Sequence, residues 1–128
     1  MRQAGLYEDD EQKALFQWAN MAACKLPELS ALFAIPNGGY RLKSTAAKLK
    51  ATGVKAGVPD IFLAVARGGY HGLFVEMKRQ DRGTVSKAQK EWIERLTEQG
   101  YLAIVCHGWV KAREAIVMYL LGEREAEI

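Results

Sequence analysis

The chain has 128 residues, of which 49% are hydrophobic and 26% are charged. These values exclude a disordered or fibrous protein, and they predict one domain over residues 1–128, with a frayed charged tail at residues 123–128. The chain lacks an apolar run of the roughly eighteen residues that a membrane span needs, and its N-terminus lacks a secretory pattern. We therefore expect a cytoplasmic protein. Apart from His107 beside Cys106, neither Cys24 nor Cys106 shows a metal-ligand spacing, which predicts buried free thiols.

The first half of the chain predicts two helices and one strand. Apolar positions recur at helical spacing over residues 8–25, and a proline then stops the pattern. The apolar run at residues 31–35 predicts a strand that enters a turn at residues 36–39, Pro-Asn-Gly-Gly. A second helix is expected from a cap at Ser44 or Thr45 to Gly53.

The second half predicts a hairpin, a capped helix, a further strand and a last helix. The expected elements are strands over residues 61–66 and 73–78, a helix from Ser86 to the stop at Gly100, a strand over residues 101–106 and a helix over residues 110–121. Ser86 and Gln89 have the spacing of a capping box at the start of the first of these helices. The complete order predicts an α/β fold with a mixed β-sheet flanked by α-helices.

Charge is distributed unevenly along the chain, although the net charge of +3 is too small to identify a nucleic-acid-binding protein. No acidic residue occurs between Glu28 and Asp60. The basic residues of that segment are Arg41, Lys43, Lys48, Lys50 and Lys55. Such segregation suits a surface that faces polyphosphate, while the ordinary alternative is the solvated face of a helix.

Three charged residues lie at the ends of the two apolar strands of the expected hairpin. Asp60 precedes the first strand, and Glu76 and Lys78 lie at the end of the second, where alternation places them on the same face. Two neighbouring carboxylates suit Mg²⁺ or Mn²⁺, which can activate water, and a lysine could orient that water or neutralise phosphate oxygens. Singly, each residue has a structural explanation as an edge pair or a turn residue. Together they predict a site for phosphodiester hydrolysis.

Two short motifs carry a resemblance to a known family. Residues 57–60, Gly-Val-Pro-Asp, and residues 74–78, Phe-Val-Glu-Met-Lys, resemble the VRR-NUC branch of the PD-(D/E)xK nucleases. The likeness extends to residues 11–12, 35–39 and 88–92, and so to nearly the whole chain. It implies a restriction-endonuclease-like core, a Mg²⁺ or Mn²⁺ cofactor and DNA as the substrate. Small stand-alone members of this family occur in phages and prophages. The resemblance to them implies a homodimer that cuts branched DNA such as four-way Holliday junctions.

The resemblance also implies roles for individual residues. Asp60 and Glu76 would bind the metal together with the Met77 carbonyl, and Lys78 would be the catalytic lysine. An additional acid and a glutamine, both on helices, would join the catalytic set as Glu11 and Gln89. Each of these two has an alternative. Glu8, one turn before Glu11, competes for the same role, and acids are favoured at a helix start by the macrodipole alone. Gln89 is explained almost as well by its capping bond.

DNA contacts are expected from the segment between the first strand and Asp60. Asn37 and Gly38 form a tight turn, and their backbone N–H groups could also lie near a phosphate. The five basic residues that follow the turn are expected to contact the DNA backbone, because no acid compensates them beside the candidate site.

Three other functions remain as alternatives. The chain could be a DNA-binding module that keeps a nuclease-like fold without catalysis, or a restriction-type endonuclease that cuts a specific duplex sequence, or a metal-binding regulator. Intact Asp60, Glu76 and Lys78 argue against the first, and the short chain argues against the second. A base-stacking surface is not indicated, because the aromatic residues Trp18, Phe62, Phe74 and Trp92 fall at core-facing spacings.

Overall fold

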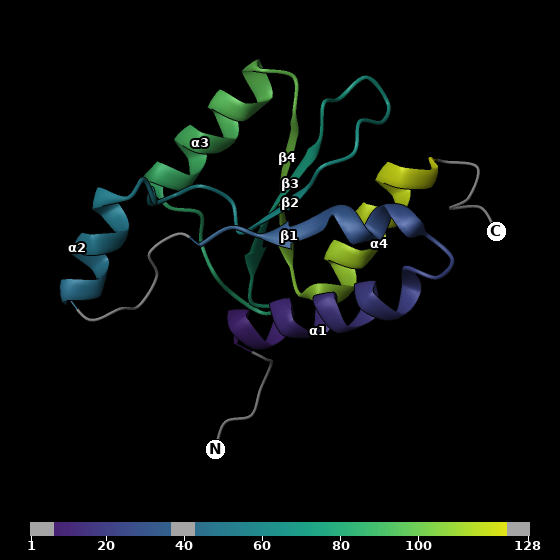
Figure 1. The fold of residues 1–128 in the computed structure, drawn as a ribbon, viewed down its shortest axis with the longest axis horizontal. Coiled ribbons are helices and arrows are strands. Elements are labelled where there is room, and N and C mark those ends of the chain that lie inside the picture. The colour runs from purple at the N-terminus through teal and green to yellow at the C-terminus, as the bar shows by residue number, and fades with distance from the viewer. Residues whose placement is uncertain (1–6, 37–42, 123–128) are drawn as a thin grey trace.

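A computed structural model of the chain describes residues 7–36 and 43–122, with side chains from residue 47 onwards in the second range. The elements in chain order are α1 (Glu8–Ala22), the 3₁₀ helix η1 (Pro27–Ala31), β1 (Leu32–Ala34), α2 (Lys43–Ala51), β2 (Ile61–Leu63), β3 (Leu73–Lys78), α3 (Lys87–Glu98), β4 (Leu102–His107) and α4 (Trp109–Leu121) (Figure 1). This order confirms the predicted α/β class. It adds the short η1, which the sequence analysis did not predict.

The strands form one mixed sheet in the order β1-β2-β3-β4. The pair β2–β3 is antiparallel, which confirms the predicted hairpin; β1–β2 is also antiparallel, and β3–β4 is parallel. A parallel neighbour requires a crossover, and α3 provides it between β3 and β4. The sheet therefore places the hairpin strand β3 in the centre, with a neighbour on each side.

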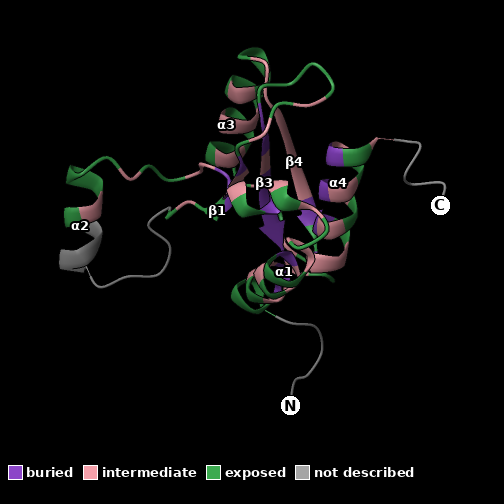
Figure 2. Cartoon of the chain, turned by 45° about the vertical axis from the view of Figure 1, so that its right-hand side comes forward, coloured by how far each residue is buried: buried purple, intermediate pink, exposed green. Residues whose placement is uncertain are grey.

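The two faces of the sheet differ in what covers them. Odd-numbered residues of β2 and β3, including Ile61, Val75 and Met77, are buried in the main core. Leu15 of α1 and Ile116 of α4 belong to the same core. Figure 2 shows α1 and α4 on one side of the sheet and α3 on the other. Because side chains alternate along a strand, the even-numbered residues of β3 face the side of α3.

Several element ends differ from the predicted ones. α1 ends at Ala22 rather than near residue 25, and η1 takes up residues 27–31, so that β1 begins only at Leu32. β2 ends at Leu63, where the Val65 N–H donates to the Leu63 carbonyl at 2.9 Å and turns the backbone out of the ladder. These differences come from local turns that apolar periodicity does not reveal.

The two thiols differ in burial. Cys106 on β4 is buried, as predicted, and burial raises its pKa to about 11, so the thiol is unreactive at neutral pH. The prediction is wrong for Cys24, which is exposed just after α1, where its Sγ donates to the Met21 carbonyl at 3.3 Å. Among the described residues, none of the helices has the length and apolar character needed to cross a membrane. The expected frayed tail, residues 123–128, lies outside the described residues.

Candidate active site

Strand register brings the two carboxylates together. Ile61 pairs with Val75, so the preceding residue Asp60 lies opposite Glu76, one step further along the same antiparallel pair. Asp60 is anchored on both sides, because its carbonyl accepts from the Ile35 N–H at 2.7 Å and its Oδ2 accepts from the Met77 N–H at 2.8 Å. The carboxylate of Asp60 is thus fixed at the central strand by a backbone donor.

Gln89 connects Glu76 with Lys78. Its Nε2 donates to Glu76 Oε2 at 2.8 Å, and its Oε1 accepts from Lys78 Nζ at 3.0 Å. Lys78 Nζ also lies 3.6 Å from Glu76 Oε2. The same Oε1 accepts from the Ser86 N–H at 2.8 Å, which completes the predicted capping box of α3. Gln89 therefore caps α3, and the cap fixes the orientation in which its amide meets Glu76 and Lys78. Its participation in catalysis stays a prediction.

Glu76 is buried in an environment that disfavours its charge. Its side chain is only 2% exposed, and burial raises its pKa to about 8, with a further rise from the charge of Asp60 and an opposing effect from Lys78. Glu76 Oε1 is also buried and receives no hydrogen bond from a described residue. A proton shared with Asp60 relieves this arrangement when Glu76 is neutral. When Glu76 is ionised, Oε1 requires a cationic partner.

The oxygen donors at this position fit a hard divalent cation. They are the carboxylates of Asp60 and Glu76, with the Met77 carbonyl beside them. The register places Met77 opposite Pro59, whose nitrogen has no hydrogen to donate to that carbonyl. Among the described residues there is no group of three or more His, Cys, Asp or Glu side chains that could hold a metal ion. A cation here would therefore depend on two carboxylates, a backbone oxygen and water.

Glu11 is buried at the same end of the sheet. It is 1% exposed, and its Oε1 accepts from the Trp109 N–H at 2.8 Å, at the N-terminus of α4. The adjacent Gly108 N–H donates to the Lys78 carbonyl, which places this contact at the end of β3. Glu8 is exposed. The observed role of Glu11 is to cap α4 from α1, and its participation in catalysis stays a prediction.

The sequence analysis did not identify the role of Gly57 in placing α3. Gly57 has φ +93°, and a Cβ there would lie 2.8 Å from the Ala88 carbonyl carbon. Only glycine combines this backbone conformation with such a close approach. The segment before Asp60 can therefore pass directly beneath the start of α3, where Gln89 follows Ala88. The sequence signal that could have indicated this close approach is the glycine three residues before Asp60.

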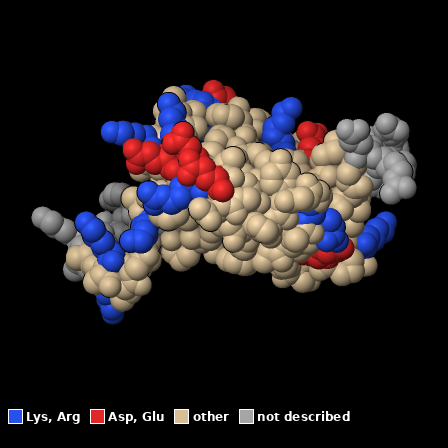
Figure 3. Space-filling model, turned by 90° about the horizontal axis from the view of Figure 1, so that it is seen from above, with Lys and Arg blue, Asp and Glu red and all other residues tan. Residues whose placement is uncertain are grey.

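The basic segment lies mainly on α2 and the loop that follows it. Lys48, Lys50 and Lys55 are exposed. α2 projects from the body of the protein in Figure 2, and the corresponding end of the molecule, on the left in Figure 3, carries basic side chains. Lys43 is the first residue of α2, and the structure describes its backbone but not its side chain. The remaining predicted DNA contacts, Asn37, Gly38 and Arg41, lie outside the described residues.

A mixed sheet with two carboxylates and a lysine at the end of its central hairpin defines a nuclease-like α/β protein. The sequence model of the VRR-NUC domain family matches residues 7–109 of the chain. A solved structure described as a VRR_NUC domain protein is 32% identical in sequence and superposes with a TM-score of 0.75, covering 94% of this chain and 93% of its own. No curated protein matches the chain. The chain belongs to the VRR-NUC domain family, a nuclease family, which confirms the resemblance seen in the sequence.

Proposed function

We propose that this protein is a metal-dependent DNA endonuclease that hydrolyses phosphodiester bonds. The observation that carries the proposal is the buried Glu76, paired with the half-buried Asp60 and lying beside Lys78, with Glu76 Oε1 lacking a hydrogen-bond donor among the described residues. Such a pair is costly to ionise unless a cation compensates it. Mg²⁺ or Mn²⁺, held by Asp60, Glu76 and the Met77 carbonyl, would supply an activated water and neutralise charge that develops on the phosphate.

Lys78 supplies a positive charge next to these carboxylates. It is 6% exposed, and its ammonium donates to Gln89 Oε1 and faces Glu76 Oε2. A cation in so dry a position interacts strongly with a phosphate oxygen that enters the site. Lys78 can therefore orient the attacking water or stabilise charge on the phosphate, and Gln89 holds it in place for either role.

DNA binding is assigned to the basic segment before Asp60. The described members Lys48, Lys50 and Lys55 are exposed and have no acidic neighbour in the sequence between Glu28 and Asp60. Contacts of this kind bind the phosphate backbone without reading its sequence. Lys43, Arg41, Asn37 and Gly38 complete the proposed DNA-binding segment. This segment supports recognition of DNA by its shape and charge.

Branched DNA is the proposed substrate, and a homodimer is the proposed active form. Both rest on the resemblance to small stand-alone VRR-NUC proteins. Two copies would present two sites to the two strands that must be cut in a four-way junction. Size-exclusion chromatography with light scattering at micromolar concentration tests the dimer, and a strict monomer would remove it from the proposal.

The experiment that tests the activity is cleavage of labelled four-way junction, flap, single-stranded and duplex DNA. Wild-type protein and a Glu76→Ala variant are compared with Mg²⁺, Mn²⁺ or EDTA, and Glu91→Ala on the exposed face of α3 is the control. Metal-dependent cutting by wild type and by the control, but not by Glu76→Ala, is the expected result. Binding without cutting under every condition would instead indicate a non-catalytic DNA-binding module.

A further inference from the structure

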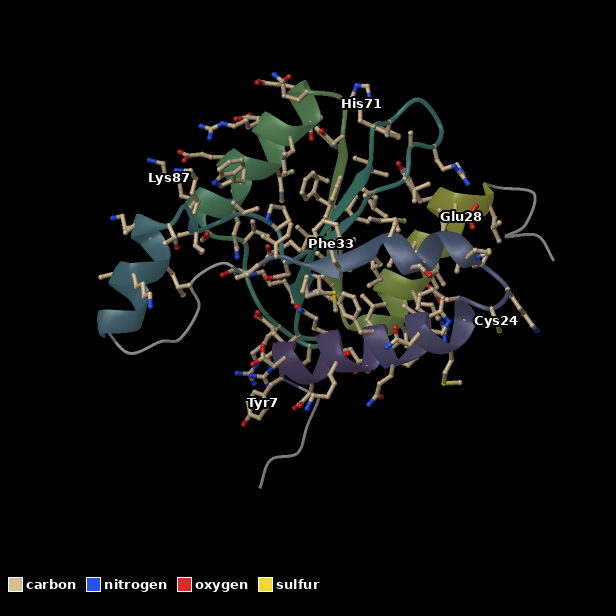
Figure 4. All side chains as sticks on the ribbon, in the orientation of Figure 1. Tyr7, Cys24, Glu28, Phe33, His71 and Lys87 are labelled. Atoms are coloured by element: carbon tan, nitrogen blue, oxygen red, sulfur yellow. The ribbon has the colours of Figure 1, made fainter. Side chains whose placement is uncertain are left out.

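A row of aromatic side chains crosses the sheet on the side opposite the main core. Phe33 of β1 lies opposite Phe62 of β2, which lies opposite Phe74 of β3. The ring centroids of Phe33 and Phe62 are 5.6 Å apart in an edge-to-face contact, and those of Phe62 and Phe74 are 4.3 Å apart and stacked. Tyr101 continues the row, with its centroid 5.3 Å from that of Phe74. Figure 4 labels Phe33 on β1 and His71, whose ring contacts Tyr101, at the far end.

These rings are not part of the main core. Phe62 and Phe74 are half-buried and do not belong to the cluster formed with α1 and α4, so the expectation that they face the core is wrong. Alternation along β2 and β3 turns them to the other face. Phe33, on the edge strand, is 48% exposed. Phe33 is thus an exposed ring that two further rings support from one side, an arrangement on which a planar ligand can stack.

The aromatic row lies next to the candidate catalytic carboxylates. Phe62 follows Asp60 by two residues, and Phe74 precedes Glu76 by two, so all four side chains share one face of the sheet. A two-residue step along a strand is roughly 7 Å. The pair of carboxylates is therefore next to the pair of aromatic rings on β2 and β3. Phe33 extends the aromatic row onto β1, the edge strand of the sheet.

We propose that Phe33 stacks against an unpaired base of the DNA strand that is cut, beside the phosphate held at Asp60 and Glu76. The proposal rests on the nuclease function above. Each ring has two faces, and the contact with Phe62 occupies at most one of those of Phe33. Every base offers a π-face, so stacking does not depend on sequence. The stack of Phe62 on Phe74 keeps Phe33 in position from behind.

Charge favours a nucleic-acid strand as the occupant of this face. The chain leading from β1 to Asp60 has basic residues and no acidic residue. Lys48, Lys50 and Lys55 are exposed on it and suit the backbone of a strand whose base lies on Phe33. An apolar partner would gain nothing from these charges. The favoured substrates are those with an unpaired nucleotide at the cut, such as a flap or an opened junction, over fully paired duplex.

A fluorescence experiment tests the stacking directly. Flap and single-stranded oligonucleotides carry 2-aminopurine at successive positions, and wild-type protein is titrated in EDTA so that the DNA stays intact. Stacking on a protein ring changes the fluorescence of this base, and one position should respond most strongly. That position should adjoin the phosphodiester cut when metal is added. A response at none of the positions would overturn the proposal.

Substitutions at Phe33 separate stacking from simple apolar contact. Phe33→Leu keeps an apolar side chain without a π-face, and it should weaken binding to flap DNA about 5- to 100-fold while leaving duplex binding unchanged. Phe33→Trp should retain flap binding. Phe33→Ala should behave as Phe33→Leu, and Tyr70→Ala, an exposed aromatic residue on the hairpin turn, is the control. Thermal unfolding checks that each variant folds.

The possible failures are distinguishable. Flap binding by Phe33→Leu equal to that of wild type would refute stacking and leave the nuclease proposal intact. A change in oligomeric state without a change in flap binding would show that a second copy covers Phe33, and would also refute it. Absence of cleavage by wild type with every metal and DNA would refute the nuclease function, whereas the 2-aminopurine response would still report on stacking.

Discussion

Replacing Glu76 with glutamine should stabilise the metal-free protein at alkaline pH and have little effect in acid. Glutamine has nearly the same volume, and its Oε1 can still accept from Gln89 Nε2, which now donates to Glu76 Oε2 at 2.8 Å. The substitution removes the ionisable group and preserves this hydrogen bond. The difference between the two proteins therefore reports the cost of the buried charge.

The raised pKa of Glu76 sets the magnitude and the pH window. Folding raises this pKa from 4.5 to about 8. Below the lower value both the folded and unfolded states hold the proton, and burial of the group costs little. Between the two values only the folded state holds it, so the free energy of unfolding of wild type falls by about 1.4 kcal/mol per pH unit. Above the upper value the full cost is roughly 4 to 5 kcal/mol, as an order of magnitude.

Urea unfolding in EDTA from about pH 5 to about pH 9 measures this difference. The stability advantage of Glu76→Gln should grow steadily over that range. Glu91→Gln, at an exposed position on α3, should show no such growth. A constant difference between Glu76→Gln and wild type across the range would refute the assigned electrostatic cost, and a less stable Glu76→Gln at high pH would indicate that the charge supports the fold.

The remaining predictions concern the metal, the lysine and the placement of α3. At pH 8, Mg²⁺ at a hundred times its Kd should increase the free energy of unfolding of wild type by about 2.7 kcal/mol, measured as a higher unfolding temperature. The increase should be much smaller in Asp60→Asn. Equal increases in the two proteins would contradict metal binding at Asp60. Lys78→Ala should fold, since Glu76 can hold a proton instead, and should bind DNA while its cleavage rate falls about 10²- to 10⁴-fold; retained full activity would exclude Lys78 from catalysis. Gly57→Ala should lower stability by several kcal/mol in urea unfolding, because its strained φ is combined with a backbone clash. Gly53→Ala, at φ +104° with nothing within 4 Å, should lose only the part due to φ, so equal losses would show that the approach to Ala88 is unimportant.

Local patterns in the sequence were sufficient for much of the site. Alternation along a strand put Glu76 and Lys78 on one face, and the two apolar runs with a glycine-rich turn between them predicted the hairpin that brings Asp60 alongside. The capping box at Ser86 and Gln89 is likewise a local motif and is present in the structure. These features depend on residues close in sequence or on a single hairpin, so periodicity and turn chemistry define them.

Contacts between distant segments were decided by the tertiary structure. The parallel pairing of β3 and β4 carries α3 back across the sheet, and only then does Gln89 meet Glu76 and Lys78. Glu11 could not be assigned its partner Trp109, 98 residues away, because nothing local to either residue encodes that meeting.

The sequence by itself determined the class of fold, the family and the residue types of the site, because these follow from spacing along the chain. The tertiary structure alone decided which face each aromatic ring occupies, how deeply Glu76 is buried and therefore how strongly its pKa is raised. Apolar periodicity shows that a strand is buried on both faces, but it does not show what covers each face. In β2 and β3, Ile61 and Val75 face the core with α1 and α4, whereas Phe62 and Phe74 lie on the opposite face, next to the exposed ring of Phe33.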